Sequence, residues 1–375
     1  MISSLVGGIG TFTINLINGL ARLGSKIDID LYLLDTRDIE RIRSIDAKNL
    51  IIHRSSTSDK GNFTKQWLMA HLNVLGKINK NKDYYDILHI NYGLTRLFLG
   101  KIRSETYKII RTIHGIPRYD LEIHPSKRIG FYLEDFLNKH VRTRGNIVNV
   151  TNSKYMKQEL LRKYGINTFV IYHGIDVKKY LLDRDKRYYK EKLGIDPDAI
   201  VFLYVGKMRL RKDPLTALKA FILLNKKIKN AILFLVGSGD MYPFIEKIVH
   251  RLNNKNIRLI PWLSEKELIE TYRASDVLVV PYINEPFGFV VVEGLATGAI
   301  PVVSDSGALS EVVGDAGLVA KSRSYVDFAR KMLVLARNAN LREILMSRGI
   351  STAQKYDFEV MAEKYYRVYS IYNKV

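Results

Sequence analysis

The sequence predicts an α/β protein with two doubly wound parallel sheets, one after the other. Three observations predict this class. Apolar strand patterns alternate with amphipathic helix patterns along the whole chain, which is typical of parallel sheets covered by helices on both faces. Glycine-containing turns follow predicted strands in both halves, at residues 7–10 and 237–239. The 375 residues are too many for one typical core and suit two domains.

The composition excludes several classes of protein. Its 47% hydrophobic and 26% charged residues are ordinary for a globular protein. The absence of cysteine excludes a disulfide scaffold and a thiolate metal site. No apolar run reaches the roughly 18–20 residues that span a bilayer, and residues 1–6 are too short and lack the basic start of a signal peptide. We therefore expect a cytoplasmic enzyme.

The formal net charge of +21 predicts anionic partners. Nucleic acid, acidic lipid head groups and phosphorylated substrates all fit that description. The basic residues are spread along the chain without forming an arm or a tail, so we expect most charged runs to be solvated surface.

The first half of the chain is expected to form one of the sheets. A short strand over residues 1–6 leads into the turn Gly7-Gly8-Ile9-Gly10 and a helix over residues 11–23, which Gly24 ends as a C-cap. Glycines here allow the backbone to approach a phosphate at the helix N-terminus. The third glycine of the G-x-G-x-x-G fingerprint is missing, so a plain tight turn stays an alternative. Further strands are expected at residues 27–34, 49–53, 87–90, 108–113, 147–151 and 168–172, and helices at residues 63–78, 126–140 and 154–164.

Two features of this half bear on function. His114 follows the strand at residues 108–113, at the carboxyl end where open parallel sheets bind ligands. A structural histidine is the alternative, but Gly115 and Pro117 beside it indicate a shaped loop. Cations also gather near the two ends of the helix expected at residues 126–140, namely Lys127, Arg128, Lys139, Arg142 and Arg144.

The second half repeats the alternation after a charged, tyrosine-rich connector. Residues 177–194 are expected to be exposed and to carry a helix. Ser264 and Glu267 form the pattern of a capping box at the start of a helix over residues 265–273. Other strands are expected at residues 200–205, 232–236 and 257–260, with two more within 276–312, and other helices at residues 214–224, 242–252, 324–338, 341–355 and 359–373.

A cationic loop follows the strand expected at residues 200–205. Lys207, Arg209, Arg211 and Lys212 supply four positive charges within six residues. Both the charge and the position past a buried strand predict an anion site. A solvated loop is the alternative.

Two glutamates separated by seven residues, Glu285 and Glu293, lie in an apolar stretch. Glu285 can be solvated in its loop, but Glu293 lies within the apolar run 289–295, where an unpaired charge is costly. Bound hydroxyl groups would be suitable partners. β-Branched residues favour a strand over 289–292, whereas the functional interpretation makes this run a buried helix whose N-terminus faces a diphosphate. Two solvated acids on an ordinary βαβ unit are the alternative.

These motifs, in this order, resemble retaining glycosyltransferases of family 4. The second half matches best and the first half more loosely, and together they cover nearly the whole chain. The resemblance implies the GT-B fold, in which two Rossmann-like parallel-sheet domains face each other across a cleft. It implies an acceptor-side domain at residues 1–174 with a crossover helix at 357–375, and a nucleotide-sugar domain at residues 175–356. The matching residues are Gly7-Gly8-Ile9-Gly10, His114-Gly115, Gly174-Ile175-Asp176, Gly206-Lys207, Lys212, Gly237-Ser238-Gly239, Ala274-Ser275-Asp276, Pro281, the E-x7-E pair Glu285 and Glu293, residues 298–303, and Gly307.

The resemblance also implies a role for each matching site residue. Glu285 would contact the transferred sugar and Glu293 the ribose diol. Lys207 and Lys212 would neutralise the diphosphate and stabilise the leaving group. His114 would contact a sugar hydroxyl or the developing charge, and it is not cast as a nucleophile. Glu285, His114, Lys212 and Lys207 are the expected catalytic residues, and the further donor-binding residues are Gly8, Gly10, Gly206, Arg209, Gly237, Ile260, Phe287, Gly288 and Phe289.

The reaction implied is the retaining transfer of a hexose-type sugar from a nucleoside-diphosphate sugar, such as a UDP- or GDP-sugar, to a glycan or lipid-linked acceptor. It would need no metal and no cofactor, because the lysines replace the metal ion and no Asp-x-Asp pair stands out. Retention in this fold is ascribed to front-face attack, with the donor phosphate helping to deprotonate the acceptor, so the glutamates are not a glycosidase pair. The sequence departs from the family at Lys207, where arginine is common, and at His173, where asparagine is usual.

The cations near residues 127–144 lie in the half that would receive the acceptor. We expect them to meet an anionic membrane surface or a lipid-phosphate-linked acceptor, so that the enzyme is cytoplasmic or peripheral on the cytoplasmic membrane face, with no nucleic acid as partner.

Two other functions stay open. One is a sugar-nucleotide 2-epimerase on the same fold, and the other is a non-enzymatic protein that binds nucleic acid or other anions through its basic charge.

Overall fold

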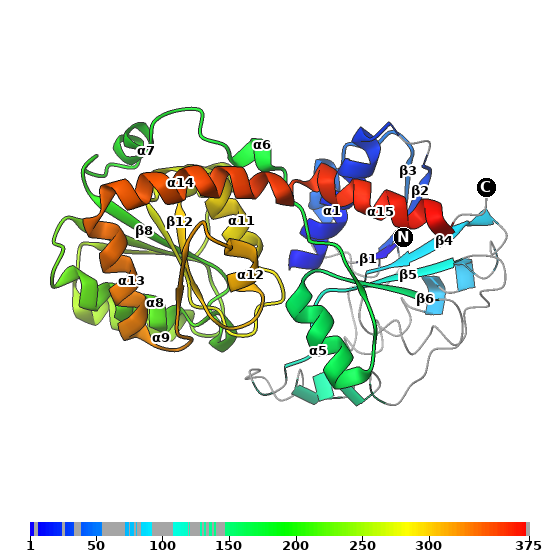
Figure 1. The fold of residues 1–375 in the computed structure, drawn as a ribbon, viewed down its shortest axis with the longest axis horizontal. Coiled ribbons are helices and arrows are strands. Elements are labelled where there is room, and N and C mark those ends of the chain that lie inside the picture. Colours follow the sequence, from blue (N-terminus) through cyan, green and yellow to red (C-terminus); the bar gives the residue numbers. More distant parts are fainter. Residues whose placement is uncertain are drawn as a thin grey trace. The chain divides into compact units, whose positions relative to one another are not determined.

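Two parallel β-sheets organise the protein, one in each of two units (Figure 1). The computed structural model describes residues 1–3, 7–24, 27–33, 39–54, 72–74, 76–78, 80, 84–91, 108–118, 120, 128–129, 131–132, 135–136, 139 and 147–372. The N-terminal unit comprises the described parts of Met1–Asp120, His124–Ile175 and Asp357–Val375, and the C-terminal unit comprises Asp176–Tyr356. The predicted α/β class with two doubly wound parallel sheets is confirmed.

The N-terminal sheet has seven strands within the described residues, all parallel, in the order β3-β2-β1-β4-β5-β6-β7. The chain winds outward from β1 in both directions, which is the strand order of Rossmann-like folds. Isoleucine and valine dominate the central strands, as expected where both faces of a sheet are covered. The strands are β1 (Ile2–Ser3), β2 (Ile29–Leu33), β3 (Leu50–Arg54), β4 (Ile87–Ile90), β5 (Lys108–Ile113), β6 (Ile147–Thr151) and β7 (Phe169–Val170).

Helices α1 (Gly7–Arg22) and α15 (Phe358–Tyr372) pack on each other within this unit, although they come from opposite ends of the chain. Arg22 and Glu359 form an ion pair of 3.0 Å between them. Helix α5 (Lys154–Tyr164) begins where the Ser153 side chain accepts a hydrogen bond from the Met156 N–H. A short 3-10 helix, η1 (Ile39–Ser44), follows β2.

The start of the chain differs from the sequence prediction. Strand β1 covers only Ile2–Ser3 of the expected residues 1–6, and α1 begins at Gly7 instead of residue 11. Gly7–Gly10 is therefore the first turn of the helix and not a loop before it. Hydrogen bonds from the Thr13 hydroxyl to the Ile9 carbonyl and from Arg41 to the Gly7 carbonyl support this turn, and these contacts outweigh the low helix propensity of glycine.

Two predicted helices of this half fall largely outside the described residues. Residues 72–74, 76–78 and 80 are helical within the region expected at 63–78 and just beyond it. Residues 128–129, 131–132, 135–136 and 139 are helical within the region expected at 126–140. The other positions of these two predicted helices lie outside the described residues.

The C-terminal sheet is also entirely parallel, and its six strands follow the order β10-β9-β8-β11-β12-β13. The chain again starts at a central strand, β8. It adds β9 and β10 on one side of β8 and then crosses back to add β11, β12 and β13 on the other side, so the strand order reverses direction between β8 and β11. The strands are β8 (Ile200–Val205), β9 (Ala231–Val236), β10 (Ile257–Ile260), β11 (Val277–Val280), β12 (Ile300–Ser304) and β13 (Leu318–Ala320).

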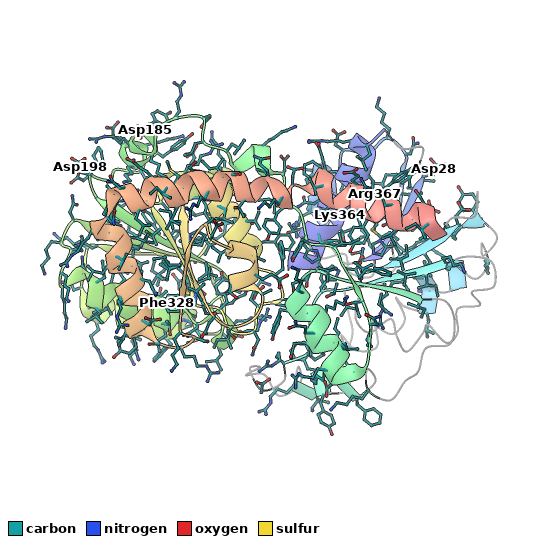
Figure 2. All side chains as sticks on the ribbon, in the orientation of Figure 1. Asp28, Asp185, Asp198, Phe328, Lys364 and Arg367 are labelled. Carbon is teal, nitrogen blue, oxygen red and sulfur yellow. The ribbon has the colours of Figure 1, made fainter. Side chains whose placement is uncertain are left out.

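Local sequence signals set the ends of several helices of this unit. Ser264 and Glu267 make both hydrogen bonds of the predicted capping box. Pro214 occupies the first turn of its helix, and the Asp213 carboxylate caps it. Figure 2 shows Phe328 on α13 (Tyr325–Arg337), where its side chain is fully buried. The helices are α6 (Val177–Tyr180), α7 (Lys186–Lys192), η5 (Leu210–Lys212), α8 (Pro214–Asn225), α9 (Tyr242–Leu252), α10 (Glu265–Ala274), α11 (Phe289–Ala296), α12 (Leu309–Val313), α13 (Tyr325–Arg337), α14 (Ala339–Ala353) and η6 (Gln354–Tyr356).

The connector at residues 177–194 is more ordered and less exposed than predicted. It carries two helices, α6 and α7, and the Asp185 carboxylate caps the second (Figure 2). Lys190 is only 5% exposed. Its ammonium lies 2.9 Å from the Asp276 carboxylate and donates to the Ala199 carbonyl. This buried ion pair ties α7 to the start of β11, an interaction that local charge density does not reveal.

Along the part of the chain that the structure describes, no helix combines the length and apolarity needed to cross a membrane.

Candidate functional site

Two of the predicted cations, Lys212 and Arg211, meet the predicted glutamate Glu285 at the point of the C-terminal sheet where the strand order reverses direction. Strands β8 and β11 are neighbours, and the loops that follow them lie at the same edge of the sheet. The loop after β8 carries Lys207 and Lys212, and the loop after β11 carries Glu285. In doubly wound sheets ligands bind at the carboxyl ends of the strands at this reversal.

Lys212 and Glu285 form the centre of this site. The Lys212 ammonium donates to Oε2 of Glu285 at 2.8 Å and lies 3.8 Å from the centre of the Tyr282 ring, while Arg211 is 3.9 Å from the same carboxylate. Burial lowers the pKa of Lys212 to about 8. Burial would raise the pKa of Glu285, but the charges of Lys212 and Arg211 outweigh it and hold that pKa below its ordinary value. Glu285 is therefore an ionised acceptor at neutral pH.

Backbone contacts hold Glu285 in place. The Ile283 N–H donates to the Arg211 carbonyl at 2.8 Å and joins the two loops. The Glu285 carbonyl accepts from the Ala308 N–H at 2.8 Å. Gly307 pairs with Glu285, and a Cβ at Gly307 would fall on the backbone nitrogen and oxygen of that glutamate. Only glycine allows this approach, which explains the residue at this position.

The N-cap residue of α11, Gly288, lies three residues past Glu285. The predicted buried helix over 289–295 is confirmed as α11 (Phe289–Ala296), so the strand favoured by local propensity is wrong. Gly288 begins it with a φ of 94°, and among the described residues no side chain caps this end. Helix N-termini attract anions through their N–H groups. Phe287 is buried and packs its ring on Phe289, so any ligand contact of Phe287 would come from its backbone.

Glu293 lies on α11 and already has a partner within the protein. The Tyr272 hydroxyl donates to its carboxylate at 2.7 Å. Burial raises the pKa of Glu293, and the Tyr272 and Tyr180 hydroxyls offset only part of that rise. The expectation that this carboxylate depends on bound hydroxyl groups is therefore incomplete, because protein hydroxyls supply part of its hydrogen bonding.

The other predicted donor-binding residues border the same sheet edge. Lys207 is exposed, and the Arg209 guanidinium lies 3.6 Å from Asp240. A Cβ at Gly237 would fall on the Gly206 carbonyl, so these two glycines pack the loops after β8 and β9 closely together. The Ile260 carbonyl accepts from the Gly237 N–H at 2.8 Å, which adds the end of β10 to this cluster.

His114 of the N-terminal unit lies beside two polar residues. Its Nδ1 is 3.1 Å from Nε2 of His173, and the Asn152 amide donates to the His114 carbonyl at 3.1 Å. Phe12 packs against both imidazole rings. Burial lowers the pKa of His114 to about 3 and holds that of His173 well below its ordinary value, so both rings are neutral.

The remaining predicted residues do not join the clusters around Glu285 and His114, although Lys139 forms an ion pair of 3.3 Å with Asp135. Gly8 and Gly10 lie in the first turns of α1. Arg128 and Lys139 are exposed on the helical positions of 128–139. Lys127, Arg142 and Arg144 lie outside the described residues.

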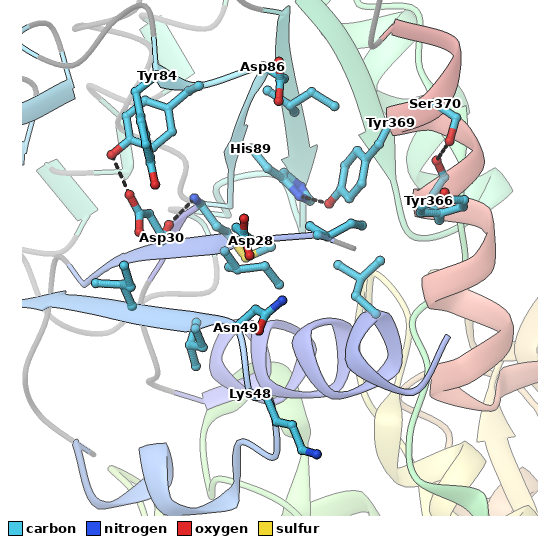
Figure 3. Close-up of a pocket in the computed structure, with 18 residues that line it drawn as sticks. Asp28, Asp30, Lys48, Asn49, Tyr84, Asp86, His89, Tyr366, Tyr369 and Ser370 are labelled. Carbon is cyan, nitrogen blue, oxygen red and sulfur yellow. Dashed lines mark hydrogen bonds between the residues drawn. The ribbon is translucent and has the colours of Figure 1, made fainter. Parts of the chain in front are cut away.

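A cavity of about 610 Å³ lies elsewhere in the N-terminal unit (Figure 3). It lies at the amino ends of β1–β4, and its polar lining includes Asp28, Asp30, Asn49, Tyr84, Asp86 and Tyr366. His114 lies past the carboxyl end of β5, and parallel strands place those ends at opposite edges of the sheet. None of the predicted site residues that the structure describes lines this cavity, so it is not part of the candidate site.

Three residues near the candidate sites were not singled out from the sequence. Asn152 directly follows β6, so its place at the carboxyl end of a strand was a usable signal. Tyr282 likewise follows β11. Tyr272 lies inside α10 and had no such signal, because its contact with Glu293 depends on how two helices pack.

Two doubly wound units, one with a buried cation–carboxylate pair at its switch point, define an α/β protein of the class that binds ligands at the carboxyl ends of its strands. Comparison with known proteins narrows the class. Residues 185–352 match the family model described as glycosyl transferases group 1, and residues 6–179 match the one described as glycosyltransferase family 4. The chain belongs to the glycosyltransferases of the family 4 type, and its fold is GT-B.

Individual relatives agree with this assignment. An uncharacterized glycosyltransferase of Methanocaldococcus jannaschii is 27% identical over 358 residues, which cover 94% of this chain and 92% of the relative. Sucrose-phosphate synthase from Thermosynechococcus elongatus has a similar structure, with a TM-score of 0.78 at 19% identity over 98% of this chain and 94% of that one. Anabaena HepE, solved in complex with UDP-glucose, has a TM-score of 0.76 at 15% identity over 97% and 96% of the two chains.

Proposed function

We propose that this glycosyltransferase moves a hexose-type sugar from a nucleoside-diphosphate sugar to a glycan or lipid-linked acceptor, with retention and without a metal ion or cofactor. The observation that carries the proposal is the Lys212–Glu285 pair beside the N-terminus of α11. A cation and a helix N-terminus suit a diphosphate, and a carboxylate suits sugar hydroxyl groups.

The donor would lie along the switch point of the C-terminal unit. Its diphosphate would contact the N–H groups at Gly288 and Phe289 together with the Lys207 and Lys212 ammonium groups. Its transferred sugar would donate hydroxyl hydrogen bonds to Glu285. The ribose would reach Glu293 beside Tyr272, and the base would lie near the backbone of Gly206, Gly237 and Ile260, with Arg209 at the rim.

The positive charge of Lys212 and the negative charge of Glu285 suit departure of the diphosphate from the sugar. The bond between sugar C1 and the diphosphate oxygen breaks as an acceptor hydroxyl attacks C1 from the same face, and the acceptor proton passes to the departing oxygen. Lys212 would stabilise the negative charge that develops on this oxygen. Glu285 stays ionised, because Lys212 and Arg211 lower its pKa, so it holds the sugar and does not serve as a proton donor.

A uridine nucleotide is the first donor to test. The similar structure of Anabaena HepE carries UDP-glucose, although identity of 15% supports the fold alone. A thermal-shift screen should compare UDP-glucose, GDP-mannose and ADP-glucose with their nucleoside diphosphates. We expect at least one nucleotide-sugar to raise the melting temperature, since a ligand that binds the folded state stabilises it. If none of them does, the proposed donor site is wrong.

Replacing Glu285 by glutamine tests the proposed role of the carboxylate. We expect Glu285→Gln to reduce transfer by about 100-fold, since a contact made to the reacting sugar is lost. Affinity for the nucleoside diphosphate should stay the same or rise, because Lys212 loses its competing partner. Glu343→Gln, an exposed change on α14, is the matched control. Wild-type transfer rates in Glu285→Gln would refute the assignment.

We further propose that the N-terminal unit contacts an anionic membrane on which the acceptor is displayed. The helical positions 128–139 expose Ile129, Tyr132 and Phe136 at spacings of one helix face, beside the exposed cations Arg128 and Lys139. Asp135, on the same segment, is buried and bonded to the Tyr164 hydroxyl at 2.6 Å. An apolar face bordered by cations suits a lipid surface.

A further inference from the structure

Three neighbouring strands of the N-terminal sheet bring three polar side chains together at their carboxyl ends. β5, β6 and β7 are paired in that order. His114 directly follows β5, Asn152 directly follows β6, and His173 is the third residue past the end of β7. The Asn152 amide nitrogen and Nδ1 of His114 lie 3.2 Å and 3.1 Å from Nε2 of His173.

The orientation of the Asn152 amide is determined by the His114 carbonyl. The amide nitrogen of Asn152 lies 3.1 Å from that carbonyl oxygen, so it donates to it. The reverse orientation would set the amide oxygen against the carbonyl oxygen, two acceptors without a proton between them. The group that faces His173 is therefore an N–H donor, and Nε2 of His173 must be the acceptor.

The same reasoning fixes His114. Its Nδ1 faces the unprotonated Nε2 of His173, so Nδ1 of His114 carries the proton and donates. A neutral imidazole has a single N–H, which leaves Nε2 of His114 with a free lone pair. Within the described residues, this Nε2 is buried and has no hydrogen-bond partner. A buried acceptor without a partner indicates a missing donor.

The surroundings keep both rings neutral. The Phe12 ring centre lies 4.8 Å from that of His114 and 4.6 Å from that of His173. The apolar ring and the burial of the site disfavour an imidazolium, so His114 does not become a cation that would attract phosphate.

We infer that His173 is a positioning residue that holds His114 as its Nδ1–H tautomer, so that Nε2 of His114 accepts a hydrogen bond from a hydroxyl group of the substrate. The hydroxyl partner rests on the proposed sugar transfer, whereas the tautomer does not. Because a bare Nε2 can only accept, it repels the oxygens of a phosphate or a carboxylate and selects a hydroxyl donor. His173 thus sets which chemical group this edge of the sheet recognises.

Nitrogen-15 NMR of the imidazole rings measures the tautomer directly, since protonated and unprotonated ring nitrogens resonate far apart. The chain has eight histidines, and loss of one signal set in His114→Asn assigns His114. We expect wild-type His114 to show a protonated Nδ1 and an unprotonated Nε2. A protonated Nε2 in the wild-type protein would overturn the inference.

Variants at position 173 test the positioning role. His173→Leu removes the acceptor, so His114 should shift toward the Nε2–H tautomer. His173→Asn keeps an acceptor oxygen and should preserve the wild-type pattern, and it replaces His173→Leu if that variant does not fold. His250→Leu changes an exposed histidine on α9 and should leave His114 unaffected. An unchanged tautomer in folded His173→Leu would show that His173 does not position His114.

Activity and ligand titration separate this inference from the proposed function. His173→Leu should lower kcat about tenfold, the value of one hydrogen bond, and leave the Kd for the nucleoside diphosphate unchanged. The nucleotide-sugar that stabilises the protein should shift the Nε2 signal of His114, and its nucleoside diphosphate should not. If a nucleotide-sugar binds without that shift, the hydroxyl contact is wrong. If none binds, the proposed function fails while the tautomer measurement still decides the role of His173.

Discussion

At the scale of single residues, two effects shift the pKa of Lys212 in opposite directions. Burial lowers its pKa from the ordinary 10.5 to about 8, while Glu285, at 2.8 Å, favours the charged ammonium. A bound diphosphate would add negative charge and raise this pKa again. Below pH 8 the ammonium is charged with or without the ligand, so binding takes up no proton. Above pH 8 binding must take up a proton, and affinity falls as the pH rises.

We therefore predict that nucleoside-diphosphate affinity decreases above about pH 8, by at most about tenfold per pH unit, because one proton is involved. Titration calorimetry from pH 6.5 to 10 measures this slope. Lys212→Arg keeps its charge throughout that range, so its affinity should not show the decrease. Lys212→Ala should bind weakly at every pH. A wild-type profile that stays flat to pH 10 would argue against Lys212 as a diphosphate ligand.

At the scale of elements, the connector helix α7 is anchored by two different kinds of ion pair. Lys190 is buried and meets the Asp276 carboxylate, whose side chain is 12% exposed and also accepts from the Val201 N–H. Lys192, two residues on, meets Glu270 at 2.6 Å, but its side chain is 42% exposed. Removing one partner of a buried pair leaves an uncompensated charge, whereas an exposed pair is screened by water.

We predict that Lys190→Met lowers the free energy of unfolding by about 3 kcal/mol, because the Asp276 carboxylate loses its counter-charge. The double variant Lys190→Met/Asp276→Asn should recover part of this loss, since asparagine still accepts from Val201 without a charge. Lys192→Met, on the same helix, should change stability little. Urea unfolding measures all three, and equal effects of the two single variants would contradict a structural role for the Lys190 pair.

At the scale of the whole molecule, the net charge of +21 favours anionic partners, and the proposed membrane contact is one exposed surface of the N-terminal unit. Ile129, Tyr132 and Phe136 are 71%, 63% and 50% exposed, next to Arg128 and Lys139. In the proposed membrane contact, the positive charge would attract the protein to anionic lipid over distances limited by salt, and the apolar side chains would then determine how well this face holds to the lipid.

We predict that the protein co-sediments with phosphatidylglycerol vesicles at low salt and is released at high salt, because salt screens the attraction. Ile129→Gln should weaken binding at both salt concentrations. Ile344→Gln, an exposed isoleucine on α14, is the matched control and should bind like the wild type. Absence of binding at low salt, or equal binding of the two variants, would exclude this surface as the membrane contact.

Local sequence patterns predicted the structure correctly where contacts between residues close in sequence determine it. The strands β4, β5, β6, β8 and β10 match the predicted ranges, and the Ser264–Glu267 capping box forms as expected. Local propensity alone failed where distant contacts override it. Gly7–Gly10 is helical although glycine disfavours helix, and the β-branched run in α11 is helical although it favours a strand.

By itself the sequence determined the α/β class, the order of its motifs and the residue types of the candidate donor site, because periodicity, caps and glycine turns act within a few residues. Only the tertiary structure decided which side chains contact one another. Lys212 and Glu285 meet because β8 and β11 are neighbours, and Tyr272 reaches Glu293 because two helices pack. The tautomer of His114 likewise depends on Asn152 and His173, which the adjacent ends of three parallel strands bring together. These contacts follow from strand order and helix packing, which no local sequence pattern encodes.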